Sequence, residues 1–261
     1  MMSRWGGLVA VRRNWTWEET LRAFALYFLI PTGQHDKKNK DVIALAESIG
    51  RNPNAVVFKL GNIKACDPMR HGKGLSHASK LDTQVWEAYQ KRGDALLEEA
   101  LNLLVDGTSS VESPTVVIEY LGHELPVGRE RAVITTARAN QTYFRNALLE
   151  NYEHRCCVSG LAIDQLLVAS HIKPWSEADP ATERLTPENG LLLDALHDRA
   201  FDKGLMTIDY DLRVVISRKV PKDEAGQSLL WRYAGHRIEV PGKFKPRRDF
   251  IEYHNDVIFQ R

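Results

Sequence analysis

The 261-residue sequence predicts an α+β fold made of two domains. Apolar residues recur at helical intervals through the first 60 residues, whereas residues 165–201 read as strand, long loop, strand and helix. Between these halves lies a stretch rich in Gly, Ser, Thr and Pro, which is typical of a linker. We therefore predict a helical domain at 1–105, an acidic linker at 106–130 and a second domain with small strands at 131–261.

Charge is segregated along the chain, although the 35 Lys and Arg residues and the 34 Asp and Glu residues leave a formal net charge of only +1. Residues 36–92 carry a net charge of +5, residues 94–128 carry -7, and residues 213–248 carry +7. A phosphate backbone feels the local potential within a Debye length, not the net charge of the whole molecule. The two basic regions therefore favour a polyanion as partner, bound with a steep salt dependence.

Composition excludes several other classes. With 43% hydrophobic and 26% charged residues the chain is typical of a globular protein. Its longest strongly apolar run, residues 24–30, is far shorter than the roughly 18 to 20 residues that cross a bilayer, so we expect a cytoplasmic protein without a membrane partner. The three cysteines, Cys66, Cys156 and Cys157, form neither a disulfide framework nor two zinc-binding pairs, and we expect the adjacent two to be buried thiols.

The first half predicts a helix-turn-helix. Thr16 and Glu19 have the spacing of a capping box in front of a helix that continues to residue 28. A short amphipathic helix over residues 41–49 ends at Gly50, and Asn52-Pro53 begins a further helix, with Asn as the cap and Pro at the first helical position.

The second helix of that pair is the element that would enter the major groove of DNA. We expect Arg51, Asn54 and Lys59 to contact phosphates or base edges there. The alternative is a purely structural helical bundle, since short patterns of this kind occur in many helical domains.

Three polar residues fall at the junctions of the second half. His171 ends the first predicted strand (165–172), Asn189 begins the second (189–193), and His197 lies in the first turns of the helix that follows Asp194. Residues 203–217 then predict a further hairpin.

These blocks resemble the HNH endonuclease family with its ββα-metal finger. Residues 169–175 (ASHIKPW), 189–193 (NGLLL) and 197–205 (HDRAFDKGL) follow the order and spacing of the branch whose motif reads AHI-P, NGLLL, H---FD-GL. The resemblance covers about residues 138–261. Less specifically, the first half resembles an amino-terminal DNA-binding-like domain of some bacterial HNH proteins.

The resemblance implies a role for each junction residue. His171 would be the general base that takes a proton from water, because a neutral imidazole suits that task at physiological pH. Asn189 would hold the long loop so that a backbone carbonyl orients the imidazole. His197 would coordinate one divalent ion beside the scissile phosphate. The expected products carry a 5′-phosphate and a 3′-hydroxyl.

One position departs from many members of the family. The residue before the base is often Asp or His and binds the metal, but here it is Ser170, a weak neutral ligand. We therefore expect Asp202 to complete the site, with Asp194 and Asp198 as less favoured substitutes. Carboxylate oxygen is the ligand that Mg²⁺ prefers, so Mg²⁺ is the expected ion, with Mn²⁺ and Ni²⁺ as alternatives.

The carboxyl-terminal basic region would grip the duplex backbone beside the metal finger, which contributes affinity without sequence information. Its expected DNA contacts are Arg213, Arg218, Lys219, Lys243, Lys245, Arg247 and Arg248.

The sequence thus predicts a metal-dependent DNA endonuclease that acts on double-stranded DNA, of restriction or defence type, with a homodimer as the default because two-strand cleavage needs two such sites. A DNA-binding regulator with a degenerate, inactive HNH unit is the alternative, motivated by Ser170. A third reading is a nuclease that cuts only modified DNA, with Trp15, Trp17 and Tyr27 as walls for a flipped base.

Overall fold

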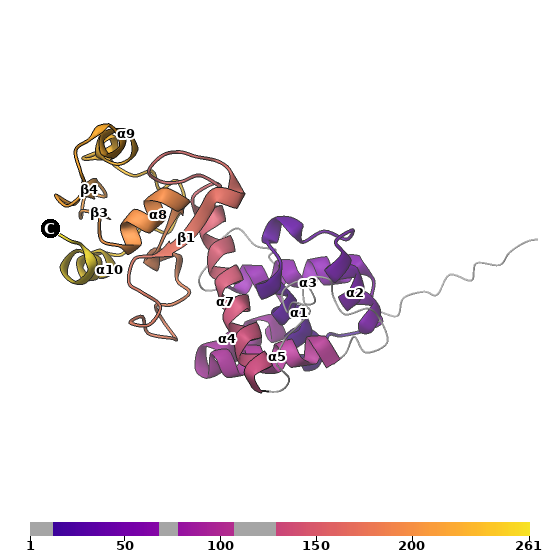
Figure 1. Ribbon diagram of the computed structural model, residues 1–261. Helices are drawn as coiled ribbons and strands as arrows, with labels where there is room; N and C mark the ends of the chain where they lie inside the picture. Colours follow the sequence, from indigo (N-terminus) through magenta and orange to yellow (C-terminus); the bar gives the residue numbers. More distant parts are fainter. Residues whose placement is uncertain (1–12, 68–77, 107–128) are drawn as a thin grey trace, which may run out of the picture.

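The computed structural model describes residues 13–67, 78–106 and 129–261. A helical amino-terminal part and a carboxyl-terminal part with two small sheets lie on either side of one long helix, so the predicted α+β class is confirmed (Figure 1). The predicted linker at 106–130 lies almost wholly outside the described residues. No described helix is long and apolar enough to cross a membrane.

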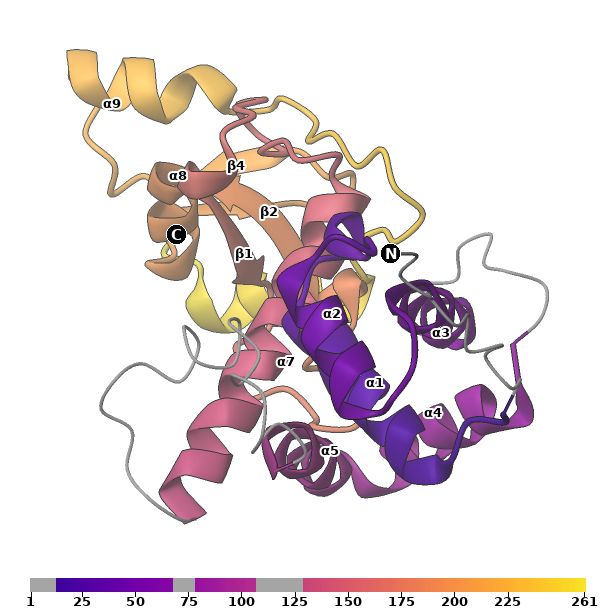
Figure 2. The same ribbon diagram turned by 90° about the vertical axis from the view of Figure 1, so that its right-hand side faces the viewer.

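The helices of the amino-terminal part surround α1, which is buried along most of its length (Figure 2). Their bounds are α1 Trp17–Leu29, α2 Lys40–Ser48, α3 Pro53–Cys66, α4 Lys80–Arg92 and α5 Asp94–Asp106, with a short 3-10 turn η1 at Thr32–Gln34.

Local sequence signals begin and end several of these helices as expected. The backbone N–H of Glu19 donates to the Thr16 hydroxyl, and the Glu19 carboxylate accepts from the Thr16 N–H, which is the predicted capping box. The Asn52 side chain caps α3, and Gly50 supplies the left-handed backbone (φ +62°) that the turn between α2 and α3 requires. Helices α4 and α5 are not among the elements that the sequence predicts.

An aromatic cluster joins the amino-terminal helices to α7 (Arg129–Asn151). The rings of Phe28 on α1 and Tyr143 on α7 stack with centroids 4.6 Å apart, and Trp86 on α4 packs edge-on to Phe24 at 4.9 Å. Tyr27 is 3% exposed inside this cluster. It therefore cannot form a wall of a surface pocket for a flipped base, and that expectation is wrong.

A buried ion pair ties α3 to α4. The ammonium of Lys59 lies 2.6 Å from a carboxylate oxygen of Asp82, and these side chains are 2% and 0% exposed. Two charges removed from water are tolerated because they pair with each other at hydrogen-bond distance.

Replacing Lys59 with Ala is expected to lower the free energy of unfolding by about 3–5 kcal/mol, because it leaves the Asp82 carboxylate buried without its counter-charge. Urea unfolding followed by circular dichroism measures the change. The exposed pair between Arg92 and Glu99 is the matched control, and Arg92→Ala should cost less than about 1 kcal/mol. Equal losses in the two variants would contradict the importance of the buried pair.

The carboxyl-terminal part has the strand, loop, strand and helix order that the sequence predicts. Strand β1 (Leu167–His171) pairs antiparallel with β2 (Gly190–Asp194), placing His171 opposite Gly190, and α8 (Ala195–Asp202) packs on both strands. The predicted hairpin forms as β3 (Met206–Ile208) and β4 (Val214–Ile216). The remaining elements are 3-10 turns η2 Asp164–Leu166, η3 Pro187–Asn189 and η4 Trp231–Tyr233, helices α9 Glu224–Leu229 and α10 Arg248–Tyr253, and the π-helix η5 His254–Ile258.

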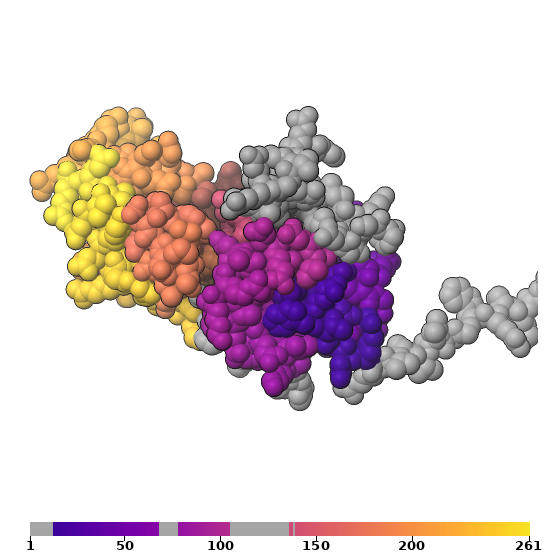
Figure 3. Space-filling view, turned by 90° about the horizontal axis from the view of Figure 1, so that it is seen from below, coloured from indigo at the N-terminus to yellow at the C-terminus, as the bar shows by residue number. Residues whose placement is uncertain are grey.

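The loop between β1 and β2 lies against the amino-terminal helices. Pro180 and Leu185 from this loop share a small cavity with Trp86 and Tyr89 of α4. The space-filling view shows the same segment touching the magenta helices (Figure 3). The two parts of the molecule therefore meet at the loop that follows His171.

Candidate active site

A hollow of about 320 Å³ lies where β1, α8 and the carboxyl-terminal π-helix meet. The polar and aromatic side chains that line it include Ser170, His171, Trp175, Asp198, Asp202 and His254. His171 and Asp202, expected to act together, are thus brought to one site.

His171 is fixed in one orientation. Its Nε2 lies 2.8 Å from the carbonyl oxygen of Arg184, which can only accept, so Nε2 donates and Nδ1 is left as the nitrogen that can take a proton. The imidazole stacks on the ring of Phe144 at 3.9 Å. Burial lowers the pKa of His171, outweighing the Arg184 carbonyl and the Asp202 charge, which raise it. The imidazole is therefore neutral at physiological pH.

Gly190 permits the stack between His171 and Phe144. A Cβ at this position would lie 2.7 Å from the Phe144 ring and 2.6 Å from Leu148, closer than carbon atoms approach. The glycine of the NGLLL block thus lets α7 lie directly against the start of β2.

Asn189 ties both ends of the long loop together. It is fully buried; its side-chain oxygen accepts from the backbone N–H of Lys173 at 2.8 Å, and its amide donates to the carbonyls of Lys173 (3.1 Å) and Glu183 (3.2 Å). Glu183 directly precedes Arg184, whose carbonyl holds His171. Asn189 thus connects Lys173, at the start of the loop, with Glu183, next to the residue that contacts His171.

Two carboxylates face the hollow from α8. Asp198 and Asp202 are four residues apart, which places them on the same side of the helix. Burial raises the pKa of Asp198, and the charge of Asp202 adds to that effect. The Ser170 hydroxyl lies near enough to Asp198 to oppose this rise, but it is buried and makes no regular hydrogen bond among the described residues.

His197 lies elsewhere. It is 2% exposed, does not line the hollow, and its Nδ1 is 2.7 Å from the carboxylate of Asp194. Burial lowers the pKa of His197, but Asp194 and the Cys156 thiol outweigh it and raise the pKa to about 9. His197 is therefore an interior cation beside an anion. The expected metal site needed His197 close to His171 and Asp202. In the structure Asp198, and not His197, lies in the hollow with these two residues.

The surroundings of His197 form a separate cluster. Ligand atoms of Cys156, Asp194 and His197 all lie within 4.8 Å of one another, and all three residues are buried. Asp194 also accepts from the Ser159 hydroxyl at 2.6 Å and caps α8. Sulfur, nitrogen and one carboxylate suit zinc better than Mg²⁺. Cys156 and Cys157 are both buried, as expected.

His254, for which the sequence predicts no role, is a second histidine of the hollow. It is 1% exposed, its ring stacks on Phe201 at 3.7 Å, and its nitrogens contact the Thr207 hydroxyl at 2.8 Å and the Phe201 carbonyl at 3.2 Å. Burial lowers its pKa to about 4. Because both ring nitrogens already have partners, His254 lines the hollow without offering a nitrogen to a water molecule or a metal ion.

The three residues expected to contact DNA in the first half occupy different places. Asn54 is exposed. The Arg51 side chain is only 9% exposed and pairs with Glu19 at 2.8 Å. Lys59 is buried against Asp82, so its ammonium cannot project from α3 into a major groove. The expectation that Lys59 lies on an exposed recognition face is wrong.

The seven basic residues expected to grip DNA in the second half lie at or near the surface, with Arg247 half-buried. Several hold local structure: Arg247 pairs with Asp249, Lys219 donates to Gln260 at 2.8 Å, and Arg248 lies over the Tyr210 ring at 4.3 Å. None of the seven lines the hollow of His171.

Comparison with known proteins identifies one region. Residues 156–209 match the family model of HNH endonucleases. A solved structure named "Modification dependent TagI restriction endonuclease" is similar at 22% identity, with a TM-score of 0.29 over 42% of this chain and 35% of that one. The chain therefore spans about a third of that protein's length. No curated protein matches the sequence. The family match spans both strands, the long loop and α8, and on that ground this chain contains an HNH endonuclease domain.

Proposed function

We propose that this protein is a metal-dependent DNA endonuclease whose catalytic centre is the hollow beside His171. The observation on which the proposal rests is the fixed orientation of the His171 imidazole. The Arg184 carbonyl holds Nε2 at 2.8 Å, which leaves Nδ1 free to act as a base in a hollow that two carboxylates also line.

In this mechanism His171 takes a proton from a water molecule as that water attacks the phosphorus. Asn189 keeps the loop, and with it the Arg184 carbonyl, in the position that selects the required tautomer of His171. As the water oxygen bonds to phosphorus, the bond between phosphorus and the 3′-oxygen breaks, and the 3′-oxygen takes a proton from solvent, giving 5′-phosphate and 3′-hydroxyl ends.

Asp198 and Asp202 are the residues that would hold the divalent ion. Two carboxylates on one helix face, beside the buried hydroxyl of Ser170, form a set of oxygen donors that fits a hard cation such as Mg²⁺ or Mn²⁺. When bound, such an ion offsets the charge that develops on the phosphate and the leaving oxygen. We assign no catalytic metal to His197, because His197 does not line the hollow and its Nδ1 contacts Asp194.

The alternative is an inactive, DNA-binding regulator. It is suggested by Ser170, which stands where many members of the family have a metal-binding Asp or His. Asp198 weakens this alternative, because its carboxylate stands beside Ser170 and supplies the negative ligand that serine lacks. The intact orientation of His171 also favours an active centre.

A restriction role, with modified DNA as a candidate substrate, is tested by comparing duplexes of one sequence that carry plain, methylated or hydroxymethylated cytosine. Each is incubated with the protein in Mg²⁺ or Mn²⁺, with EDTA as control. Cleavage of any of them, absent in EDTA, supports the nuclease. Cleavage of the modified duplexes alone would show that the nuclease depends on the modification. Equal cleavage of all three duplexes would show that it does not.

Cleavage is expected to stay constant as pH falls from 8 to about 6.5 and to decline only below the ordinary pKa of histidine. Burial lowers the pKa of His171, so the base remains neutral in this interval. Single-turnover rates at saturating metal give the profile. A rate that already halves near pH 7 would contradict the assignment of His171 as base.

A further inference from the structure

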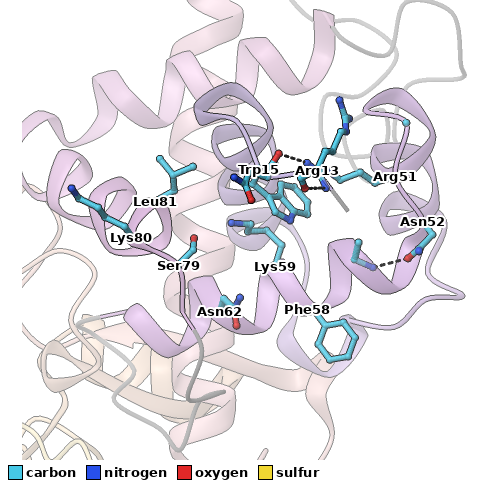
Figure 4. A pocket seen from close by; sticks show the side chains of 13 residues that line it. Arg13, Trp15, Arg51, Asn52, Phe58, Lys59, Asn62, Ser79, Lys80 and Leu81 are labelled. Carbon is cyan, nitrogen blue, oxygen red and sulfur yellow. Dashed lines mark hydrogen bonds between the residues drawn. The ribbon is translucent and has the colours of Figure 1, made fainter. Parts of the chain in front are cut away.

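A cleft with cationic walls lies on the amino-terminal part of the molecule (Figure 4). It has a volume of about 810 Å³ and is bounded by the segment before α1, by α3 and by the start of α4. It shares no lining residue with the hollow of His171. Among the described residues that line it none is acidic, and four are cationic: Arg13, Arg51, Lys59 and Lys80.

Two buried carboxylates stand behind these cations. Glu19 pairs with Arg13 at 2.6 Å and with Arg51 at 2.8 Å, and Asp82 pairs with Lys59. Against four cations these two anions leave a net positive charge, and Lys80 stands exposed at the rim. Arg51 and Lys59 are as buried as the carboxylates they pair with, whereas the Arg13 side chain is 52% exposed and Lys80 is exposed. A molecule that enters the cleft therefore meets the positive charges of Arg13 and Lys80.

Two helices also begin at the cleft. The first turn of α3 contributes Asn52 and Ala55, and the first turn of α4 contributes Ser79, Lys80 and Leu81. The amino-terminal end of a helix carries a partial positive charge, which favours an anion. Both ends therefore add to the attraction that the side chains exert on an anion.

Aromatic side chains complete the walls. The Trp15 ring lies 4.3 Å from the guanidinium of Arg51 and 4.7 Å from the ammonium of Lys59, so these long side chains are fixed (Figure 4). Phe58 is 62% exposed and also lines the cleft. The Nε of Arg51 is buried and has no hydrogen-bond partner among the described residues. Cations beside exposed aromatic rings are the combination by which proteins bind a nucleic-acid strand.

We propose that this cleft binds the phosphate backbone of DNA and is the contact that the amino-terminal part makes with the substrate. The identity of the ligand as DNA rests on the proposed nuclease function. The cleft is far larger than one phosphate group, so it admits a phosphate together with the flanking nucleoside. Binding in this cleft differs from insertion of α3 into a major groove, because Lys59 stays within the wall, paired with Asp82.

The test uses the full chain carrying His171→Ala, so that bound DNA is not cut. Fluorescence anisotropy with a labelled duplex gives Kd over a series of salt concentrations. Lys80→Glu reverses a charge at the cleft, and Lys91→Glu, an exposed position in the last turn of the same helix, is the matched control. Lys80→Glu should raise Kd about tenfold and reduce the salt slope by about one, whereas Lys91→Glu should change Kd less than about twofold.

Phe58→Ala provides a second, charge-neutral variant, and loss of the apolar contact between its ring and the sugar beside the bound phosphate should weaken binding without changing the salt slope. If Lys80→Glu and Phe58→Ala both bind like Lys91→Glu, the cleft is not the DNA contact. Tighter binding of a single-stranded RNA of the same sequence than of the duplex would also overturn the proposal. Because this assay measures binding by a chain that cannot cut, its failure is distinct from an absence of cleavage by the unaltered protein.

Discussion

His171→Ala is expected to lower the single-turnover rate of DNA cleavage by about 10²–10⁴-fold, the range over which a general base contributes. The variant removes Nδ1 from a hollow that otherwise keeps its carboxylates, so affinity for DNA should remain within about twofold of the parent. Cleavage of a labelled duplex with excess enzyme gives the rate, and anisotropy gives the affinity.

His154→Ala is the matched control for this variant. His154 is an exposed histidine paired with Asp164 at 2.9 Å, and it does not line the hollow. Its replacement should leave cleavage unchanged. His171→Gln, which retains a polar side chain beside Phe144, guards against a folding defect and should also fail to cleave. Undiminished cleavage by His171→Ala would show that His171 is not the general base.

Asp198→Asn and Asp202→Asn are expected to produce the second large effect, a loss of cleavage on the order of 10²-fold at low Mg²⁺, because each removes a charged oxygen ligand from the site. The Mg²⁺ concentration that gives half-maximal rate should rise in both variants. Cleavage measured over a metal titration gives both quantities.

His197→Gln distinguishes this site from the cluster of Cys156, Asp194 and His197. The variant should unfold at a lower temperature, because it removes the cation from a buried pair with Asp194, but it should keep the half-maximal Mg²⁺ concentration of the parent. A raised metal requirement in His197→Gln, with none in Asp198→Asn and Asp202→Asn, would move the metal to the cluster and contradict our assignment.

The choice between His197 and Asp198 illustrates a limit of sequence reasoning. Neighbouring residues on a helix point about 100° apart, so two adjacent ligand-type residues face different surroundings. The spacing of the motif predicts where the helix lies in the sequence, but not which of its faces is turned toward the hollow. The structure turns His197 toward Asp194 in the interior and turns Asp198, with Asp202 four residues later, toward the hollow. Their shared helical face was the signal that could have identified Asp198.

The antiparallel strand pair and the helix after it were predictable because each element has its own local sequence signal. Apolar, β-branched residues predicted β1, Asn189-Gly190 began β2, and Asp194 capped α8. The carbonyl of Arg184 could not be predicted, because any backbone has a carbonyl, and only the folded loop brings this one to His171. Similarly, Lys59 has the sequence environment of an exposed basic residue, and only the packing of α4 places Asp82 against it.

The measurement that tests the central claim most directly is the nicking of a supercoiled plasmid by the unaltered protein in Mg²⁺ or Mn²⁺, with EDTA in parallel. An HNH centre built on His171, Asp198 and Asp202 predicts nicked or linear DNA with 5′-phosphate and 3′-hydroxyl ends in the presence of metal, and intact plasmid in EDTA. Plasmid that binds the protein but stays supercoiled with every metal and every cytosine modification would contradict the account and establish the DNA-binding regulator instead.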